Sequence, residues 1–375
     1  MSLSLPADPP RARRLTGVVP QLLRSLTGAG DWFAPATSAV VFVVDGLGSA
    51  QLAARSGHAR FLSASGTKKD VARTVFPSTT TAALTSLLTG EEPGTHGIVG
   101  YRARVPGTDL VADQLHGWET HGLDPHSWQR AQPLLERESD AGRPVFVVSK
   151  AEYLGTGFTR ATLRGAEFVS AATVGERAGL AADLAARHPG ALVYLYANDL
   201  DAVGHKRGWE SDAWIAALER VDAAARTLSE GLAPGTGAVV TADHGMVDVP
   251  RHKHILVTAD SDLAADVRLI GGEPRMLHLY VEPGQERHVL ERWRSSESGR
   301  SWVMSRDDAI DSGLFGPVAA EVRPRIGDVL VAARAGVAYY DDRVADTSSQ
   351  KMVGQHGSLT NEERVVPLIR LGAFA

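Results

Sequence analysis

The sequence predicts an α/β protein with a largely parallel central sheet covered by helices on both faces, a three-layer αβα sandwich. Two observations lead to this prediction. Short β-branched runs end in turn-forming or charged residues, and segments whose apolar residues recur at helical spacing lie between them. Because the runs are apolar throughout, they are typical of strands buried on both faces, and right-handed crossovers arrange such strands in parallel.

The clearest strand signals are apolar runs at residues 39–46, 144–149, 191–199, 237–245 and 364–372. Segments with helical spacing are expected to form helices at residues 79–88, 128–139, 174–187 and 211–230. Along much of the chain the predicted strands and helices alternate, as they do in a doubly covered sheet.

The stretch 247–340 has a different pattern. PRMLHLYVEPG indicates a strand and a turn, GQERHVLERWRSS a helix, and SWVMS another short strand. We expect it to form a small α+β insertion or cap on a catalytic domain that spans residues 16–375. Residues 1–15 are rich in Pro and Arg, and we expect them to form a flexible N-terminal segment.

Composition excludes several classes of protein. The net charge of -5 argues against a nucleic-acid coat or a membrane-surface protein. No apolar run approaches the roughly 20 residues that span a bilayer, and the N-terminus lacks the apolar core of a signal peptide, so we predict a cytoplasmic protein. The chain has no cysteine, which excludes disulfides, thiol catalysis and Cys-based zinc sites. A metal ion would therefore need histidine and carboxylate ligands.

Candidate ligand residues lie where the predicted strands end, which is where ligands gather in folds of this kind. Asp45 closes the first strand, and Asp243 and His244 close the fourth. Asp201 and His205 follow the third strand, and their i, i+4 spacing puts both on one face of a helical turn. Taken singly, these residues also have ordinary explanations as a helix cap, a solvated helix face or a turn.

His356, in VGQHGSLTNEERVVPL, brings the set to three carboxylates and three histidines, although by itself it could be a loop histidine. The six side chains are the kind of ligand set that zinc takes where no thiolate is present. Six ligands are too many for one tetrahedral ion and suit two, each with an open position. Two ions about 4 Å apart can clamp the attacking and leaving oxygens of an in-line displacement at phosphorus. Such a site needs a nucleophile nearby.

The stretch FPSTTTAALTSLLTG, residues 76–90, places three threonines behind Pro77. One interpretation is that Pro77 and Ser78 open a helix, the threonines fill its first turn and Gly90 ends it. A second interpretation is that one hydroxyl is a nucleophile at the helix start, where free N–H groups and the positive end of the helix hold an anion.

Five motifs, in their order and separation, resemble the nucleotide pyrophosphatase/phosphodiesterase (type I phosphodiesterase) branch of the alkaline phosphatase superfamily. They span residues 41–367 and are VFVVDGLG, VFPSTTTAALTSLLTGEEPGTHGIVGY, DLDAVGH, VVTADHGM and GQHGSLTNEERVVPL. The resemblance implies an alkaline-phosphatase-like fold. It also implies a hydrolase that acts on phosphate diesters or phosphoanhydrides of small molecules, nucleotides among them, at a two-zinc site. Manganese or iron are alternative ions for histidine and carboxylate ligands.

The resemblance further implies a role for each candidate residue. Thr80 aligns with the family's nucleophile, which attacks phosphorus and forms a phosphothreonine intermediate. The implied ligands of one zinc ion, which also touches Thr80, are Asp45, Asp243 and His244. The implied ligands of the other ion are Asp201, His205 and His356.

Two positions depart from the family pattern. Where the family usually has an asparagine three residues after the nucleophile, and often a lysine before it, this chain has Ala83 and Thr79. Phosphoryl oxygens would then be bound by the metal ions and by backbone N–H groups at the helix start, such as that of Thr81. The departure keeps two alternatives open. One is a phosphomonoesterase or phosphonate hydrolase of the same superfamily, and the other is a catalytically inactive metal-binding homologue.

Overall fold

Strand β1 (Ser38–Val44) lies inside a seven-stranded sheet, and all of its residues are buried. The computed structural model describes residues 5–375, and the strand order of this sheet is β2-β17-β8-β1-β7-β5-β6. The strands parallel to β1 are β5 (Val145–Ser149), β6 (Glu167–Ser170), β7 (Leu192–Ala197) and β8 (Thr236–Thr241). The prediction of a largely parallel, buried sheet is confirmed.

Two strands at one edge of this sheet complete it. β17 (Val365–Gly372) pairs antiparallel with β8, and β2 (Val71–Arg73) pairs antiparallel with β17. Each of the five predicted runs forms a strand. The runs 191–199 and 237–245 form shorter strands than expected, which end at Ala197 and Thr241. Beyond Thr241, Asp243 accepts hydrogen bonds from the backbone N–H groups of Gly46 and His244, so the chain leaves the strand ladder there.

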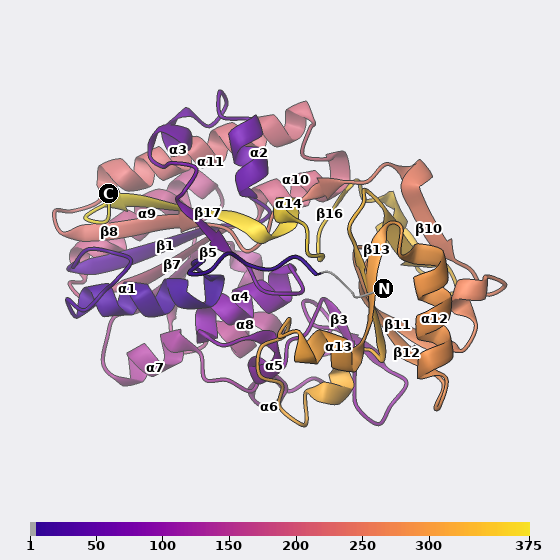
Figure 1. Ribbon diagram of the computed structural model, residues 1–375. Coiled ribbons are helices and arrows are strands. Elements are labelled where there is room, and N and C mark those ends of the chain that lie inside the picture. The colour runs from indigo at the N-terminus through magenta and orange to yellow at the C-terminus, as the bar shows by residue number, and fades with distance from the viewer. Residues whose placement is uncertain (1–4) are drawn as a thin grey trace.

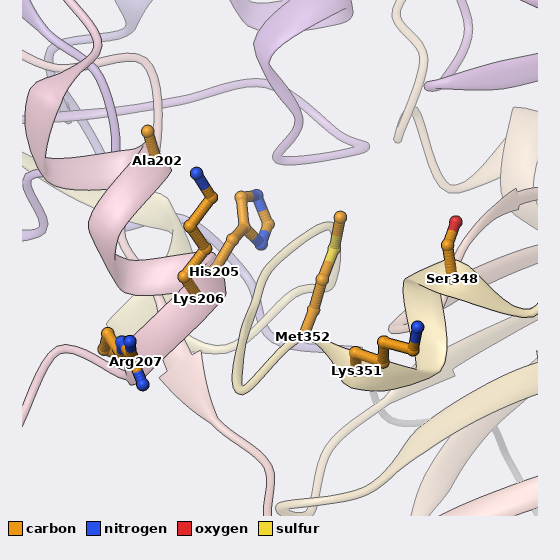
Figure 2. A pocket seen from close by; sticks show the side chains of 7 residues that line it. All are labelled: Ala202, His205, Lys206, Arg207, Ser348, Lys351 and Met352. Carbon is orange, nitrogen blue, oxygen red and sulfur yellow. The ribbon is translucent and has the colours of Figure 1, made fainter.

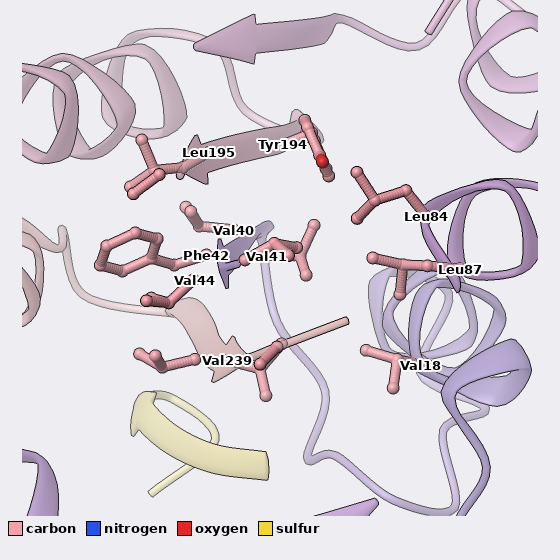
Figure 3. Close-up of a cluster of buried hydrophobic side chains, with 14 of the residues drawn as sticks. Val18, Val40, Val41, Phe42, Val44, Leu84, Leu87, Tyr194, Leu195 and Val239 are labelled. Atoms are coloured by element: carbon pink, nitrogen blue, oxygen red, sulfur yellow. The ribbon is translucent and has the colours of Figure 1, made fainter. Parts of the chain in front are cut away.

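Helices cover both faces of the sheet (Figure 1). α9 and α11 pack together on one face, and α1 and α4 lie on the other. Figure 3 shows Val18 of α1 and Leu84 and Leu87 of α4 turned toward Val41 and Tyr194 of the sheet. The helices from residue 5 to residue 231 are α1 (Val18–Leu26), α2 (Ser49–Ala54), α3 (Arg60–Ala64), α4 (Thr80–Thr89), α5 (Pro93–His96), α6 (Pro125–Trp128), α7 (Leu134–Asp140), α8 (Gly157–Thr162), α9 (Val174–Arg187), α10 (Asp199–Arg207) and α11 (Asp212–Gly231).

One predicted helix is wrong. The stretch 128–139 does not form a single helix, because α6 ends at Trp128 and α7 begins at Leu134. Gln129 adopts an extended backbone, and Pro133 stands at the N-cap of α7. Proline lacks an N–H group and disfavours helical backbone at the residue before it, so it starts a helix more readily than it continues one.

A second sheet lies beside the main one, with α12 (Glu286–Glu297) packed on it (Figure 1). Its four antiparallel strands run in the order β11-β12-β14-β13, and we call it the cap sheet. Its strands are β11 (Val267–Glu273), β12 (Met276–Val281), β13 (Ser301–Ser305) and β14 (Val329–Ala333). The cap sheet falls inside the stretch 247–340 that the sequence sets apart, and the division into domains stays a prediction.

The remaining elements are short. They include the helices α13 (Arg306–Asp311) and α14 (Asn361–Arg364) and the strand pairs β3 (Arg102–Arg104) with β4 (Val111–Asp113), β9 (Val247–Asp248) with β16 (Gly354–Gln355), and β10 (His254–Val257) with β15 (Ala338–Asp341). Across residues 5–375, every helix is too short or too polar to cross a bilayer.

The flexibility expected of residues 1–15 stays a prediction. The first four of these residues lie outside the described part of the chain. Within the described part, Asp8 forms ion pairs with Arg364 at 3.0 Å and Arg73 at 3.4 Å.

Candidate metal centre and nucleophile

The residues that the sequence singles out come together at one edge of the main sheet. Asp45 directly follows β1, and Asp243 and His244 follow β8. Asp201 and His205 lie on α10, which begins just after β7. Because β1, β7 and β8 are parallel and adjacent, their carboxyl ends share one edge, and the loops beyond them deliver these side chains to the same place.

His244 is the centre of a first buried group. Its Nε2 lies 3.4 Å from Asp45 Oδ1 and 3.4 Å from Asp243 Oδ2. The same nitrogen lies 3.1 Å from the hydroxyl oxygen of Thr80. All four side chains are buried. The ligands expected for the first metal ion thus lie around the predicted nucleophile.

A second group lies next to the first. His205 Nε2 is 3.3 Å from Asp201 Oδ1 and 3.3 Å from His356 Nε2. His356 Nε2 is 3.9 Å from Asp201 Oδ1. The rings of His244 and His356 stack with centroids 3.7 Å apart, so the two groups adjoin.

The three histidine rings are oriented as metal ligands would be. In each ring Nδ1 lies within hydrogen-bond distance of a backbone carbonyl oxygen, and an Nδ1–H donated there leaves the Nε2 lone pair facing the cluster. The contacts are His205 to Gly354 at 2.8 Å, His244 to Gly245 at 3.0 Å and His356 to Ser78 at 3.1 Å.

The three carboxylates also have the surroundings expected of metal ligands. Asp45 Oδ1, Asp201 Oδ1 and Asp243 Oδ2 are buried and accept no hydrogen bond from the described residues. Burial, and then the charge of Asp243, raise the pKa of Asp45 well above its ordinary value, and burial raises the pKa of Asp243. Anionic groups at such positions need a compensating charge. Divalent cations would supply it, so the donor set fits two of them.

Thr80 stands at the start of α4. Its N-cap, Thr79, makes no side-chain capping bond, and the first N–H groups of a helix have no partner within the helix. Thr81 instead turns its hydroxyl to the carbonyl of Gly100 at 2.9 Å. Thr80, in contrast to Thr81, directs its hydroxyl oxygen at the cluster. Ala83, one turn further on, is fully buried and offers no polar side-chain atom.

Sequence reasoning missed two residues at this site. The hydroxyl of Tyr196 donates a hydrogen bond to Asp45 Oδ2, from the strand next to β1. Glu273, the last residue of β11, lies 3.3 Å from Nδ1 of His356. Tyr196 belongs to the predicted strand run LVYLYA. The alternation of side chains along a strand could have predicted the face of the sheet on which it lies. No sequence signal connects Glu273 to the site, because it comes from the cap sheet.

Comparisons with known proteins agree with this geometry. A family model described as type I phosphodiesterase / nucleotide pyrophosphatase matches residues 39–359. The chain belongs to this family. This family is part of the alkaline phosphatase superfamily, as the sequence motifs indicate.

Solved structures of similar fold include two that cover most of the chain. Murine ectonucleotide pyrophosphatase / phosphodiesterase 5 has a TM-score of 0.69 at 16% identity and covers 89% of this chain and 88% of its own. Phosphonoacetate hydrolase from Sinorhizobium meliloti, in complex with phosphonoformate, has a TM-score of 0.66 at 20% identity and covers 90% of both chains. At these identities the likeness shows the alkaline-phosphatase-like fold.

Curated relatives match over shorter stretches. A phosphopentomutase from Methylobacterium nodulans is 42% identical over 118 residues, which are 30% of this chain and 27% of the relative. A phosphopentomutase from Sinorhizobium medicae is 30% identical over 193 residues, 44% of this chain and 45% of the relative. The chain thus matches less than half the length of these relatives.

Proposed function

We propose that the protein hydrolyses a phosphate diester or phosphoanhydride of a small molecule, nucleotides included, through a phosphothreonine intermediate on Thr80 at a two-zinc site. The observation that carries this proposal is the 3.1 Å between the Thr80 hydroxyl oxygen and His244 Nε2 at the free N-terminus of α4. A hydroxyl in that place has metal-ligand groups on one side and helix N–H groups on the other.

Each proposed metal position has three protein ligands. Asp45, Asp243 and His244 would hold the ion next to Thr80. Asp201, His205 and His356 would hold the other. When bound, such ions lower the pKa of a neighbouring hydroxyl or water and neutralise charge on phosphoryl oxygens.

The residues of the chain then act in two displacements. In the first, a bond forms between Thr80 Oγ1 and phosphorus, the hydroxyl proton passes to water, and the leaving group departs with the electron pair of its P–O bond. In the second, a water oxygen attacks the same phosphorus, and the Thr80 oxygen leaves and regains a proton. The N–H group of Thr81 would donate a hydrogen bond to a phosphoryl oxygen at the helix start. The net reaction consumes one water.

One relative supports the choice of nucleophile. The murine protein is also known as an inactive threonine-to-alanine variant in complex with AMP. We infer that AMP-like phosphoryl groups are candidate substrates of this chain as well.

A second candidate function is hydrolysis of a phosphomonoester or a phosphonate. Ala83 favours it, because it removes the polar group that the family usually offers to a phosphoryl oxygen. The phosphonoacetate hydrolase fold supports the phosphonate version.

A panel of three substrates separates these functions. The zinc-loaded protein would be assayed with bis(p-nitrophenyl) phosphate, p-nitrophenyl phosphate and phosphonoacetate at equal concentrations. We expect the highest kcat/KM for the diester. A clear preference for the monoester or the phosphonate would replace the leading proposal by the second one. Two bound metal ions with no turnover of any substrate would indicate a metal-binding homologue without catalysis.

A further inference from the structure

His356 lies in a short stretch of chain that is fixed at both ends, and we call residues 353–360 the His356 segment. At its start, Val353 donates its N–H to the carbonyl of His205 on α10 at 2.7 Å. Figure 2 shows His205 with Met352, the residue just before the segment, at the edge of one pocket. The end of the segment is fixed by a different part of the chain.

Glu363, in α14, holds the end of this segment. Its Oε1 accepts a hydrogen bond from the N–H of Ser358 at 3.0 Å, and its Oε2 accepts one from the hydroxyl of Thr360 at 2.6 Å. The main-chain carbonyl of Glu363 also accepts the N–H of Gly245, the residue after His244, at 2.9 Å. Glu363 therefore contacts the segments that carry ligands of both proposed metal positions.

The carboxylate of Glu363 is paired with a cation from the cap sheet. Strands β11 and β12 form a hairpin that turns at residues 274 and 275, and we call it the cap hairpin. Arg275 Nε donates to Glu363 Oε1 at 2.7 Å, and Arg275 Nη2 donates to Glu363 Oε2 at 2.9 Å. Both side chains are buried. The guanidinium group also donates to three carbonyl oxygens at the end of β14 and just beyond it, those of Ala333, Ala335 and Val337.

The tip of the cap hairpin also fits closely against the backbone of the His356 segment. Gly357 has a φ of 122°, and a Cβ atom at this position would meet Cδ of Glu273 at 2.6 Å. The hydroxyl of Ser358 donates to the carbonyl of Ala333 at 2.5 Å. The cap sheet thus contacts the segment through the ion pair, through a close approach and through a hydrogen bond.

Ser78, two residues before Thr80, is bound to the same segment. It donates its N–H to the carbonyl of Gly357 at 3.1 Å and its hydroxyl to the carbonyl of Ser358 at 2.7 Å. His356 Nδ1 lies 3.1 Å from the carbonyl oxygen of Ser78. A shift of the His356 segment would therefore displace both a proposed metal ligand and the backbone that leads to the proposed nucleophile.

A buried ion pair of this kind fixes geometry more than it adds stability. Removing two charges from water costs free energy, and the pair regains it only where the geometry is good and the other polar atoms are hydrogen-bonded. A guanidinium fork and a carboxylate joined by two parallel hydrogen bonds meet in one arrangement, which apolar side chains of the same size would not specify. The pair is therefore better suited to aligning two segments than to strengthening the fold.

We propose that Arg275 and Glu363 are positioning residues that align His356 with the second metal position, which it forms with Asp201 and His205. This inference rests on the proposed function for the identity of the metal ligands. Within residues 5–375, neither the Arg275 nor the Glu363 side chain forms a hydrogen bond or ion pair with a proposed ligand. They act through the backbone of the His356 segment instead.

The test compares two buried glutamates in matched surroundings. Glu297, at the end of α12, is buried like Glu363. It accepts two hydrogen bonds from Arg300 at 2.7 and 2.9 Å and one from the hydroxyl of Tyr339 at 2.6 Å. Within the described chain, its side chain makes no hydrogen bond to the His356 segment. Glu363→Gln and Glu297→Gln therefore remove the same charge from similar pairs, and only the first pair touches the segment.

We expect Glu363→Gln to lower zinc affinity at the second position by roughly tenfold, because an amide oxygen cannot accept from Arg275 and Ser358 as the carboxylate does. Affinity at the first position should stay unchanged, since the main-chain bond to Gly245 remains. Glu297→Gln should lower Tm and leave both zinc affinities unchanged. Arg275→Lys keeps the charge without the fork, so its affinity at the second position should lie between those of the wild type and Arg275→Met.

Zinc titrations in the presence of a competing chelator measure these affinities without turnover. Two unchanged affinities in Glu363→Gln, with a Tm lowered as in Glu297→Gln, would overturn the inference while the hydrolase function stands. If Glu363→Gln does not fold, Arg275→Lys decides, and wild-type affinity at the second position in that variant would overturn the inference.

The reaction is judged separately, by turnover of a nitrophenyl diester. A wild type that binds two zinc ions and hydrolyses no diester, with the second affinity still lowered in Glu363→Gln, would keep the positioning pair and reject the reaction. A wild type that binds fewer than two zinc ions would refute the two-metal site and this inference with it.

Discussion

Glu273 Oε2 lies 3.3 Å from Nδ1 of His356, so a carboxylate from the cap sheet touches a histidine of the predicted metal centre. Both side chains are buried, and the same histidine nitrogen lies 3.1 Å from the carbonyl oxygen of Ser78. A carboxylate behind a metal-binding histidine fixes the ring and makes it a better ligand. We therefore expect the cap sheet to contribute to the second of the two proposed metal positions.

Replacing Glu273 should weaken one metal site and spare the other. We expect Glu273→Gln to lower zinc affinity at the position formed by Asp201, His205 and His356 by roughly 10- to 100-fold, because an amide orients the ring without a negative charge. Competition with a zinc-binding dye would resolve the two affinities. Glu282→Gln, an exposed change in the same part of the chain, is the control. Two unchanged affinities would show that Glu273 has no role in metal binding.

Thr80 can be tested apart from metal binding. We expect Thr80→Ala to reduce kcat for the best diester at least about a thousandfold, because it removes the hydroxyl that lies 3.1 Å from the proposed ligand His244. Zinc content should stay at two ions per chain, since the six proposed ligands are untouched. Thr80→Ser keeps a hydroxyl and should retain measurable turnover. An alanine variant that turns over at the wild-type rate would remove Thr80 from the mechanism.

The features that could be predicted from the sequence are those that depend only on patterns of residues close together in the chain. Asp45, Asp201 and Asp243 follow buried apolar runs, and strands of that kind bring their ends to one sheet edge, so these residues could be found from sequence. Glu273 could not, because its approach to His356 depends on how the cap sheet packs against the main sheet.

The helix expected at 128–139 failed for a local reason. Its apolar spacing is compatible with one helix, but Pro133 separates two short ones. The penalty of proline at a helix interior is about 3 kcal/mol, which outweighs the small gains that spacing alone predicts.

Removal of metal should destabilise the protein, and Asp45 should account for part of the loss. Burial and the nearby Asp243 charge raise the pKa of Asp45, so an ionised Asp45 without a bound cation lowers the free energy of unfolding. We expect chelation to lower the Tm of the wild type by several degrees. The chelated Asp45→Asn protein should melt above the chelated wild type, yet gain less from added zinc. Calorimetry of both proteins with and without chelator would measure these Tm values. A chelated Asp45→Asn protein that melts below the chelated wild type would contradict the proposed repulsion between Asp45 and Asp243.

Acid should destabilise the fold through His96, away from the metal centre. This ring is fully buried, accepts an N–H from Ile98 at 3.1 Å and lies 2.8 Å from the hydroxyl of Ser86. Burial, and then the charge of Arg325, lower the pKa of His96 to about 3. The unfolded chain therefore binds a proton between about pH 6.5 and pH 3 that the folded chain does not, so stability is present above pH 6.5 and is lost as the pH falls.

The size of this effect follows from the difference between the two pKa values. At pH 5 the loss from His96 alone is about 2 kcal/mol relative to pH 8. His96→Gln keeps a polar side chain but does not titrate, so the free energy of unfolding should fall less steeply with pH in that variant, even if its stability at pH 8 is lower. Urea unfolding at pH 8, 6 and 5 measures both slopes. Because loss of metal ions at low pH affects both proteins alike, the difference between the slopes isolates the histidine, and equal slopes would show that His96 is not the group that takes up the proton.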